Sequence, residues 1–240
     1  MKSLADVRAL TFDCYGTLID WESGILSALR PLMHRDGLAI EDHRLLEEFG
    51  KAESRIERDN PHLPYTDVLR HVHHALSRQF GLAEDIDEAT RFANSVGDWP
   101  PFPDTIGALR DLQKHYKLVI VSNTDNTSFS RTQQRLGVTF DAAVIAEEVG
   151  AYKPDHRMFA RAFEVIAEMG ITKDHILHVA QSLYHDHVPA KELGLTTVWV
   201  DRYRGRPGHG AAVGPVADVQ PDYTVTTLRE LTVLLGVSSV

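Results

Sequence analysis

The sequence predicts an α/β protein with a doubly wound parallel sheet and an inserted all-helical cap. Short apolar runs alternate with segments whose apolar residues recur at helical spacing, a pattern typical of parallel strands joined by covering helices. One long segment, residues 21–98, breaks this alternation because it holds helical patterns and no strand pattern. The predicted core therefore comprises residues 1–20 and 99–240, and the predicted cap comprises residues 21–98.

The core elements follow from these apolar runs. The predicted strands are residues 8–13, 118–121, 142–145, 176–180, 196–200 and 223–225. Helical spacing between them predicts helices over about 104–115, 126–136, 155–169 and 186–193, followed by a terminal helix.

The cap is read from amphipathic patterns over residues 25–33, 44–56, 68–80 and 86–96. The stretch 99–103 (WPPFP) cannot continue a helix, so it indicates a stiff return into the core. Residues 204–215, rich in Gly, Arg and Pro, are expected to form a flexible excursion.

Charge and composition exclude several classes of partner. The chain has 25 Lys and Arg against 34 Asp and Glu, a formal charge of −9, which argues against nucleic-acid binding. No apolar run approaches the ~20 residues that a membrane span needs, and the N-terminus lacks a secretory layout. We therefore expect a cytoplasmic protein that binds neither nucleic acid nor membrane.

The cysteine and histidine residues limit which metal sites the chain can form. The single cysteine, Cys14, excludes an internal disulfide and a zinc site built from paired thiolates, and it is expected to be buried. His71, His73 and His74 lie close together in a predicted helix, where a solvated helix face is favoured over metal ligation. His185 and His187 are weighed as bases for water, and a structural role is favoured.

Polar side chains gather where the predicted strands end, and the carboxyl ends of parallel strands meet at one edge of a sheet, where ligands bind. A carboxylate, a lysine and a second carboxylate there suit covalent catalysis, in which one acid attacks, the cation balances charge and the other acid handles water. The candidates are Asp13 with Thr17, Ser122 with Asn123, Lys153, and the loop 181–186.

Four of these segments, in this order, resemble the motifs of the haloacid dehalogenase superfamily. They are 13–18 (DCYGTL), 121–123 (VSN), 152–155 (YKPD) and 181–186 (QSLYHD), and the resemblance covers roughly 5–20 and 100–235. It implies a Rossmann-like core with a small cap domain. It also implies that Asp13 is the nucleophile, that Lys153 balances its charge, and that Ser122 and Asn123 contact the substrate.

Two positions favour one branch of the superfamily. Phosphatases of the superfamily usually carry Asp two residues after the nucleophile, where this chain has Tyr15, and an acid where it has Gln181. The chain instead resembles the metal-independent type II 2-haloacid dehalogenases. The resemblance implies no cofactor, and halide displacement from a short 2-haloalkanoic acid through an aspartyl ester, giving a 2-hydroxy acid.

In that reading the substrate is a small anion, and Asp186 helps the hydrolytic water. The resemblance assigns substrate contacts to Tyr15, Thr17, Ser122, Asn123 and Gln181.

The chain also departs from the dehalogenase pattern. It has Phe159 where those enzymes have Tyr, and no cap Arg clearly matches their substrate-carboxylate anchor. Lys51, Arg55 or Arg58 could replace that anchor.

Two alternatives stay open: a Mg²⁺-dependent phosphatase of a small metabolite, and a catalytically silent binding protein. A homodimer is suggested by the resemblance alone. The natural substrate, the halogen and the stereochemistry do not follow from the sequence.

Overall fold

The computed structural model describes residues 4–205, 210–212 and 219–237, whose strands form one parallel sheet in the order β3-β2-β1-β4-β5-β6. The central strand β1 pairs on both sides, with Phe12 beside Ile120 and Val179. This arrangement confirms the predicted α/β class. The strands are β1 (Ala9–Phe12), β2 (Lys117–Ser122), β3 (Ala142–Ile145), β4 (Ile176–Ala180), β5 (Thr196–Val200) and β6 (Tyr223–Val225).

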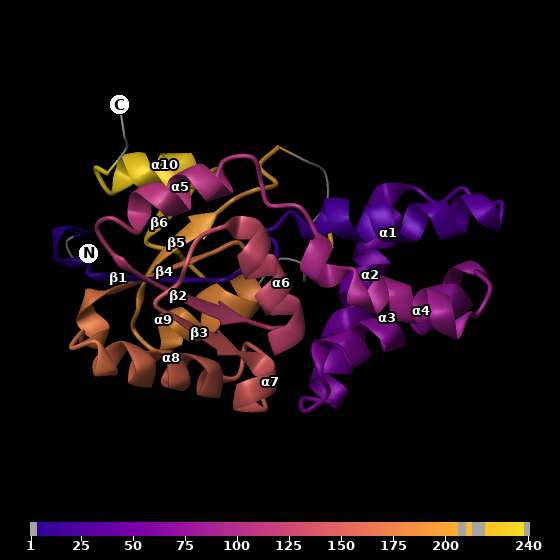
Figure 1. Cartoon of the computed structure of the whole chain (residues 1–240), viewed down its shortest axis with the longest axis horizontal. Coiled ribbons are helices and arrows are strands. Elements are labelled where there is room, and N and C mark those ends of the chain that lie inside the picture. The colour runs from indigo at the N-terminus through magenta and orange to yellow at the C-terminus, as the bar shows by residue number, and fades with distance from the viewer. Residues whose placement is uncertain (1–3, 206–209, 213–218, 238–240) are drawn as a thin grey trace.

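Helices cover both faces of the sheet. In Figure 1, α5 and α10 lie together on one side and α8 lies on the other. Because both faces are covered, strands β1 and β4 are buried along their whole length and are apolar except for Thr11 and His178. The core helices are α5 (Thr105–Leu112), α6 (Asn126–Leu136), α7 (Ala146–Val149), α8 (His156–Glu168), α9 (Val188–Glu192) and α10 (Leu228–Leu234).

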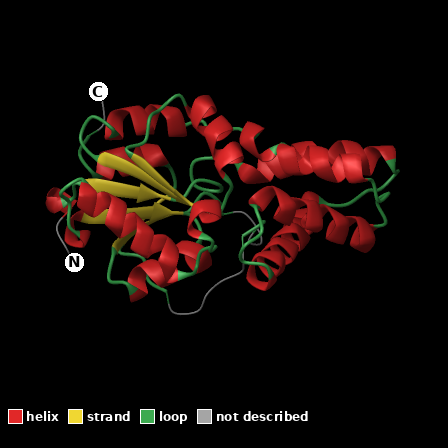
Figure 2. Cartoon of the chain, turned by 60° about the horizontal axis from the view of Figure 1, so that its bottom comes forward, coloured by secondary structure: helices red, strands yellow, loops and turns green. Residues whose placement is uncertain are grey.

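The segment after β1 forms a group of helices beyond the carboxyl ends of the strands (Figures 1 and 2). These cap helices are α1 (Trp21–Arg35), α2 (Asp42–Asp59), α3 (Tyr65–Phe80) and α4 (Ile86–Asn94). Helix α1 begins earlier than the apolar spacing predicts, because Asp20 caps it by accepting from the Ser23 backbone N–H at 3.2 Å. The exact domain boundaries stay a prediction.

The helix predicted over residues 186–193 is wrong, because the chain forms two shorter helical elements there. Instead of a single helix over 186–193, a π-helical turn, η4 (Leu183–His187), precedes α9. The Ser182 side chain accepts from the His185 backbone N–H at 3.1 Å, so the chain begins to coil soon after β4. Asp186 therefore lies inside this turn rather than at a helix start.

The loop predicted over 204–215 lies partly outside the described residues, which omit 206–209 and 213–215. Its described piece 210–212 packs against the cap: Ala211 is buried and donates its backbone N–H to Glu22 Oε1 at 2.9 Å.

Arg202, which follows β5, ties two loops together. Its Nε and Nη2 donate to the Thr17 carbonyl oxygen at 3.1 and 2.9 Å, and its Nη1 donates to both carboxylate oxygens of Asp104. The guanidinium also lies over the Phe102 ring, 4.1 Å from its centroid. The turn after β1 is thereby fixed to the segment that returns from the cap.

Two further expectations can be compared with the fold. Cys14 is fully buried, as expected. Within the described parts of the chain, no helix combines the length and apolar character that crossing a bilayer requires.

The contact between α1 and the segment returning from the cap yields a test. A Cβ added to Gly24 would lie 2.2 Å from Trp99 Cγ, whereas one added to Gly107 in α5 meets no atom within 4 Å. We expect Gly24→Ala to lower the free energy of unfolding by about 1–3 kcal/mol. Gly107→Ala, the matched control, should raise it by up to about 1 kcal/mol. Urea unfolding measures both, and equal effects of the two variants would contradict this packing.

Candidate active site

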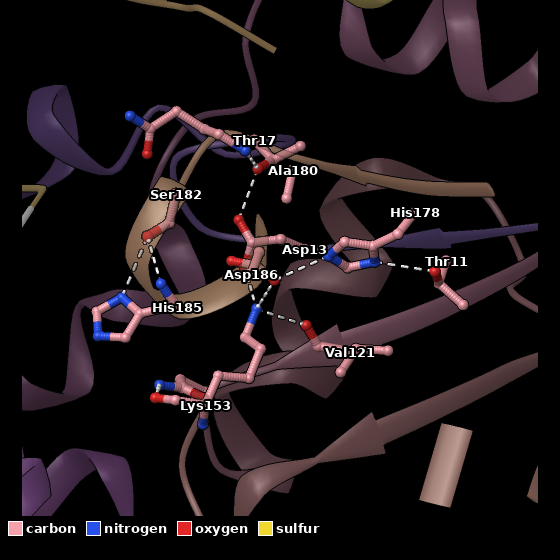
Figure 3. A network of polar contacts seen from close by, with 12 residues as sticks. Thr11, Asp13, Thr17, Val121, Lys153, His178, Ala180, Ser182, His185 and Asp186 are labelled. Carbon is pink, nitrogen blue, oxygen red and sulfur yellow. Dashed lines mark hydrogen bonds and ion pairs between the residues drawn. The ribbon is translucent and has the colours of Figure 1, made fainter. Parts of the chain in front are cut away.

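Asp13 ends the central strand and is buried. Gly16, at φ 91°, lets the chain turn back immediately, which brings Thr17 over the carboxylate. The Thr17 hydroxyl donates to Asp13 Oδ2 at 2.6 Å and accepts from the Gln181 backbone N–H at 2.9 Å. Thr17 therefore links the loops after β1 and β4 (Figure 3).

Lys153 is the centre of the polar network in Figure 3, and only 2% of its surface is exposed. Its ammonium donates to Asp13 Oδ1 at 2.8 Å, to Asp186 Oδ1 at 2.7 Å and to the Val121 carbonyl oxygen at 2.9 Å. An ammonium has three N–H donors, so this cation is fully engaged.

Asn123 holds the backbone of Lys153. Its Oδ1 accepts from the Lys153 N–H at 2.6 Å, and its Nδ2 donates to the Lys153 carbonyl at 3.1 Å. The hydroxyl of the neighbouring Ser122 is buried and has no hydrogen-bond partner among the described residues. Asn123 thus positions the lysine, while Ser122 keeps a free donor beside the cavity.

Asp186 is held by a histidine that the sequence analysis missed. His178 Nε2 lies 3.2 Å from Asp186 Oδ1, and His178 Nδ1 lies 2.9 Å from the Thr11 hydroxyl. The signal available in the sequence is a lone polar residue inside the apolar run of β4. The second oxygen of Asp186, Oδ2, is unpartnered among the described residues.

Burial and mutual charge set the protonation of this trio. Burial raises the pKa of Asp13, Lys153 partly offsets this, and Asp186 adds to the rise. For Lys153, burial acts to lower the pKa, but the two carboxylates outweigh it and raise the pKa. For Asp186, burial is outweighed by Lys153 and His178, so its pKa is lowered.

One cavity collects almost all of the predicted site residues. Seven of the eight line it and Thr17 is the exception, lying behind Asp13. The roles assigned to these side chains stay predictions. The lining comprises Asp13, Tyr15, Trp21, Glu53, Glu57, Tyr65, Ser122, Asn123, Lys153, Gln181, Ser182, His185, Asp186 and Ala212.

Aromatic rings form part of the cavity wall. The Tyr15 hydroxyl hydrogen-bonds to the Thr132 hydroxyl at 2.9 Å. The Tyr15 ring stacks on Tyr65 with centroids 6.5 Å apart and meets the edge of Trp99 at 6.0 Å. These contacts join the loop after β1 to the cap.

The cap brings two carboxyl groups that the sequence analysis missed. Glu53 and Glu57 stand one turn apart on α2, and each is only 5% exposed. The Tyr65 hydroxyl donates to Glu53 Oε1 at 2.5 Å, and Asn123 Nδ2 donates to Glu57 Oε2 at 3.3 Å. Their signal in the sequence is two acids on the same helical face as Phe49 and other apolar residues.

Burial perturbs both of these acids. It raises the pKa of Glu53 to about 7 despite the Tyr65 hydrogen bond. Burial, and then repulsion from Glu53, raises the pKa of Glu57 well above its ordinary value.

The three cap cations suggested as anchors for the substrate carboxylate lie outside the cavity. Lys51, Arg55 and Arg58 are exposed, and none lines the cavity, so that suggestion is wrong. The reason is helical periodicity: these residues lie on the opposite face of α2 from Glu53 and Glu57.

The histidines fall into different environments. His185 lines the cavity, and burial lowers its pKa to about 4. His187 is buried, and its Nε2 donates to the Ala180 carbonyl at 3.0 Å, a structural role. The predicted solvated face is wrong for His73, which is 1% exposed and packs near Phe92.

The donor set fits a magnesium ion poorly. Among the described residues, no three His, Cys, Asp or Glu side chains are grouped so that they could share a metal. Asp13 and Asp186 are bridged by the Lys153 ammonium, and the neutral side chains Tyr15 and Gln181 line the same cavity. In the part of the chain that the structure describes, a hard divalent cation at the core end of the cavity would find only these two carboxylates, and the ammonium already occupies the position between them.

The raised pKa of Glu53 predicts a pH-dependent stability. A folded-state pKa of about 7, against 4.5 ordinarily, means that the folded chain holds a proton the unfolded chain releases in that window. Glu53 therefore destabilises the protein progressively as pH rises from about 4.5 to about 7. We expect the stability gain of Glu53→Gln over the wild type to grow by about 1–3 kcal/mol between pH 5 and pH 8.

Urea unfolding at both pH values measures this gain. Glu41→Gln, an exposed substitution at the start of α2, is the control and should show no such growth. A gain for Glu53→Gln that is the same at both pH values would refute the assignment.

Because Lys153 is buried between two carboxylates, we expect substitutions at Lys153 and Asp13 to have non-additive effects on the free energy of unfolding. Lys153→Met leaves Asp13 and Asp186 buried without their cation, and we expect a loss of about 3–5 kcal/mol in the free energy of unfolding. Adding Asp13→Asn removes one uncompensated charge and should restore part of that loss. Chemical unfolding of the four proteins in this cycle gives the coupling, and simple additivity would contradict the network.

Comparison with known proteins finds relatives that match most of the chain. An (S)-2-haloacid dehalogenase of Pseudomonas putida is 27% identical over 236 residues, covering 95% of this chain and 96% of that protein. A pyrimidine 5′-nucleotidase of Escherichia coli is 30% identical over 151 residues, covering 60% of this chain and 61% of that protein.

Among solved structures, the fold matches an L-2-haloacid dehalogenase of Xanthobacter autotrophicus with chloropropionic acid covalently bound. The TM-score is 0.78 at 21% identity, covering 97% of this chain and 100% of that one. A family model described as haloacid dehalogenase-like hydrolase matches residues 7–193, which is most of the chain. The chain therefore belongs to the haloacid dehalogenase-like hydrolases.

Proposed function

We propose that this hydrolase displaces halide from a short 2-haloalkanoic acid through an ester on Asp13 and releases a 2-hydroxy acid. The observation that carries the proposal is the buried Asp13–Lys153–Asp186 network opening into a cavity whose other motif positions are neutral, Tyr15 and Gln181. The (S)-2-haloacid dehalogenase relatives, which match nearly the whole chain, support the same substrate class.

In the first step, a carboxylate oxygen of Asp13 attacks C2 of the substrate. A carbon–oxygen bond forms while the carbon–halogen bond breaks, and halide leaves with the bonding electron pair. Halide is a stable anion, so no proton donor is needed, and a Tyr in place of an acid at position 15 suits this step. Lys153 and Thr17 hold the attacking carboxylate in one orientation.

In the second step, water attacks the carbonyl carbon of the aspartyl ester. The bond between the acyl carbon and the substrate oxygen breaks, and the oxygen of the water remains in the Asp13 carboxylate. In this proposal Asp186 Oδ2, which is unpartnered among the described residues and belongs to a lining residue, accepts a proton from the water. A proton returns to the leaving alkoxide, which departs as the 2-hydroxy acid. His185, neutral at pH 7 and also in the lining, is a second acceptor.

The substrate carboxylate needs donors at the core end of the cavity. The Ser122 hydroxyl is buried, lines the cavity and has no partner among the described residues, so it is free to donate. The dehalogenase with chloropropionic acid covalently bound shows that the same fold supports a covalent acid adduct, which is consistent with the proposed intermediate.

The proposal predicts metal-independent halide release. Purified protein should liberate chloride from 2-chloropropionate at an unchanged rate in EDTA, and Asp13→Asn should lower kcat by at least about 10³-fold because the nucleophile is lost. Chloride assay and mass spectrometry of Asp13 after turnover in ¹⁸O-water provide the measurements. Turnover of an aryl phosphate only with Mg²⁺, without halide release from any short haloacid, would overturn the proposal.

A further inference from the structure

Within the described part of the chain, the cap side of the cavity offers acceptors and no cation. Glu53 and Glu57 each use one carboxyl oxygen, with Tyr65 and Asn123 as donors. Neither second oxygen is among the fully enclosed atoms that lack a partner, and both groups line the cavity, so these oxygens are open to it. A ligand donor that enters the cavity can therefore reach them.

The charge of the lining favours a cationic donor. Among the described lining residues, four carboxyl groups (Asp13, Asp186, Glu53 and Glu57) share the cavity with one ammonium, that of Lys153. All three donors of Lys153 already serve Asp13, Asp186 and the Val121 carbonyl, so none remains for the cap pair. A substrate that carried only a carboxylate would add further acid to this lining without a cation for the cap pair.

Aromatic rings line the same cavity. Tyr15, Trp21 and Tyr65 contribute to its wall, and the rings of Tyr15 and Tyr65 are stacked. Aromatic faces next to carboxylates form a favourable environment for an organic cation. The rings therefore favour a charged donor over a neutral one.

We propose that Glu53 and Glu57 bind an ammonium group of the substrate, which is therefore a 2-haloalkanoic acid with an amino group on its carbon chain. This inference rests on the proposed function and specifies its substrate class. The substrate carboxylate stays at the core end near Ser122, the halogen-bearing carbon faces Asp13, and the ammonium faces the cap. The zwitterion adds no net charge to the cavity.

The raised pKa values of the two acids agree with this assignment. Burial raises both, and repulsion from Glu53 adds to the rise at Glu57; a cation between the carboxyl groups would act in the opposite direction on each.

Three nearly isosteric substrates test the proposal. They differ at one terminal group: 2-chlorobutanoate carries methyl, 2-chloro-3-hydroxypropionate carries hydroxyl, and 3-amino-2-chloropropionate carries ammonium. Initial chloride release by both enantiomers of each should give kcat/KM highest for the amino compound, at least about tenfold above the methyl compound, because a desolvated ion pair forms only with the ammonium.

The variants Glu57→Gln and Glu53→Gln/Glu57→Gln keep the side-chain shape and remove the charge. We expect each to reduce the amino-to-methyl ratio of kcat/KM by about tenfold or more, chiefly through KM. Glu41→Gln, which lies outside the cavity, should keep the wild-type ratio. If Glu57→Gln leaves the amino-to-methyl ratio of kcat/KM unchanged, the proposed ammonium site is overturned. If the hydroxyl and amino compounds have equal kcat/KM, the requirement for a positive charge is overturned.

A binding measurement separates this inference from the proposed function. Calorimetry with Asp13→Asn, which lacks the nucleophile, should show the amino compound binding at least about tenfold more tightly than 2-chlorobutanoate. Equal affinities would refute the ammonium site even if the wild type releases halide. Tighter binding of the amino compound without halide release from any compound would support the site and refute the proposed chemistry.

Discussion

A single buried cation organises the site. The Lys153 ammonium joins the end of β1, the end of β2 and the turn after β4 through Asp13, the Val121 carbonyl and Asp186. Burying three charged groups is expensive unless each is paired and hydrogen-bonded, and here every donor of the ammonium is used. The same contacts that fix the orientation of the Asp13 carboxylate therefore also hold together the carboxyl ends of the central strands.

The surrounding contacts keep this trio rigid from several sides. Asn123 fixes the Lys153 backbone, His178 holds Asp186 from within the sheet, and Arg202 anchors the Thr17 loop. These supporting groups come from strands or from loops tied to strands, so they move little relative to one another. The cap, by contrast, contributes aromatic rings and two buried acids to the cavity. The lysine and its two carboxylates thus belong to the core, and the cap lines the opposite side of the cavity.

Much of the site was predictable because it depends on chain position. Asp13, Ser122 and Asn123 lie at the ends of strands whose apolar runs are evident, and the carboxyl ends of parallel strands meet at one edge. The same rule selected Lys153 and the loop that contains Asp186, and the resemblance to known motifs then implied a role for each. His178 was missed because a polar residue within a buried strand has no local signature beyond its own identity. The turn at residues 183–187 was missed because one capping contact, from Ser182, decides where coiling begins.

By itself, the sequence determined the order of strands and helices, the position of the helical insertion and the identity of the candidate motifs, because periodicity and motif spacing are local properties of the chain. Only the tertiary structure decided which groups face the cavity. Lys51, Arg55 and Arg58 point away from the cavity while Glu53 and Glu57 of the same helix line it. The packing of α2 against α3 and the core decides which face of the helix lines the cavity. That face carries acids and the opposite face carries cations, and no local pattern specifies which face of a cap helix meets the core.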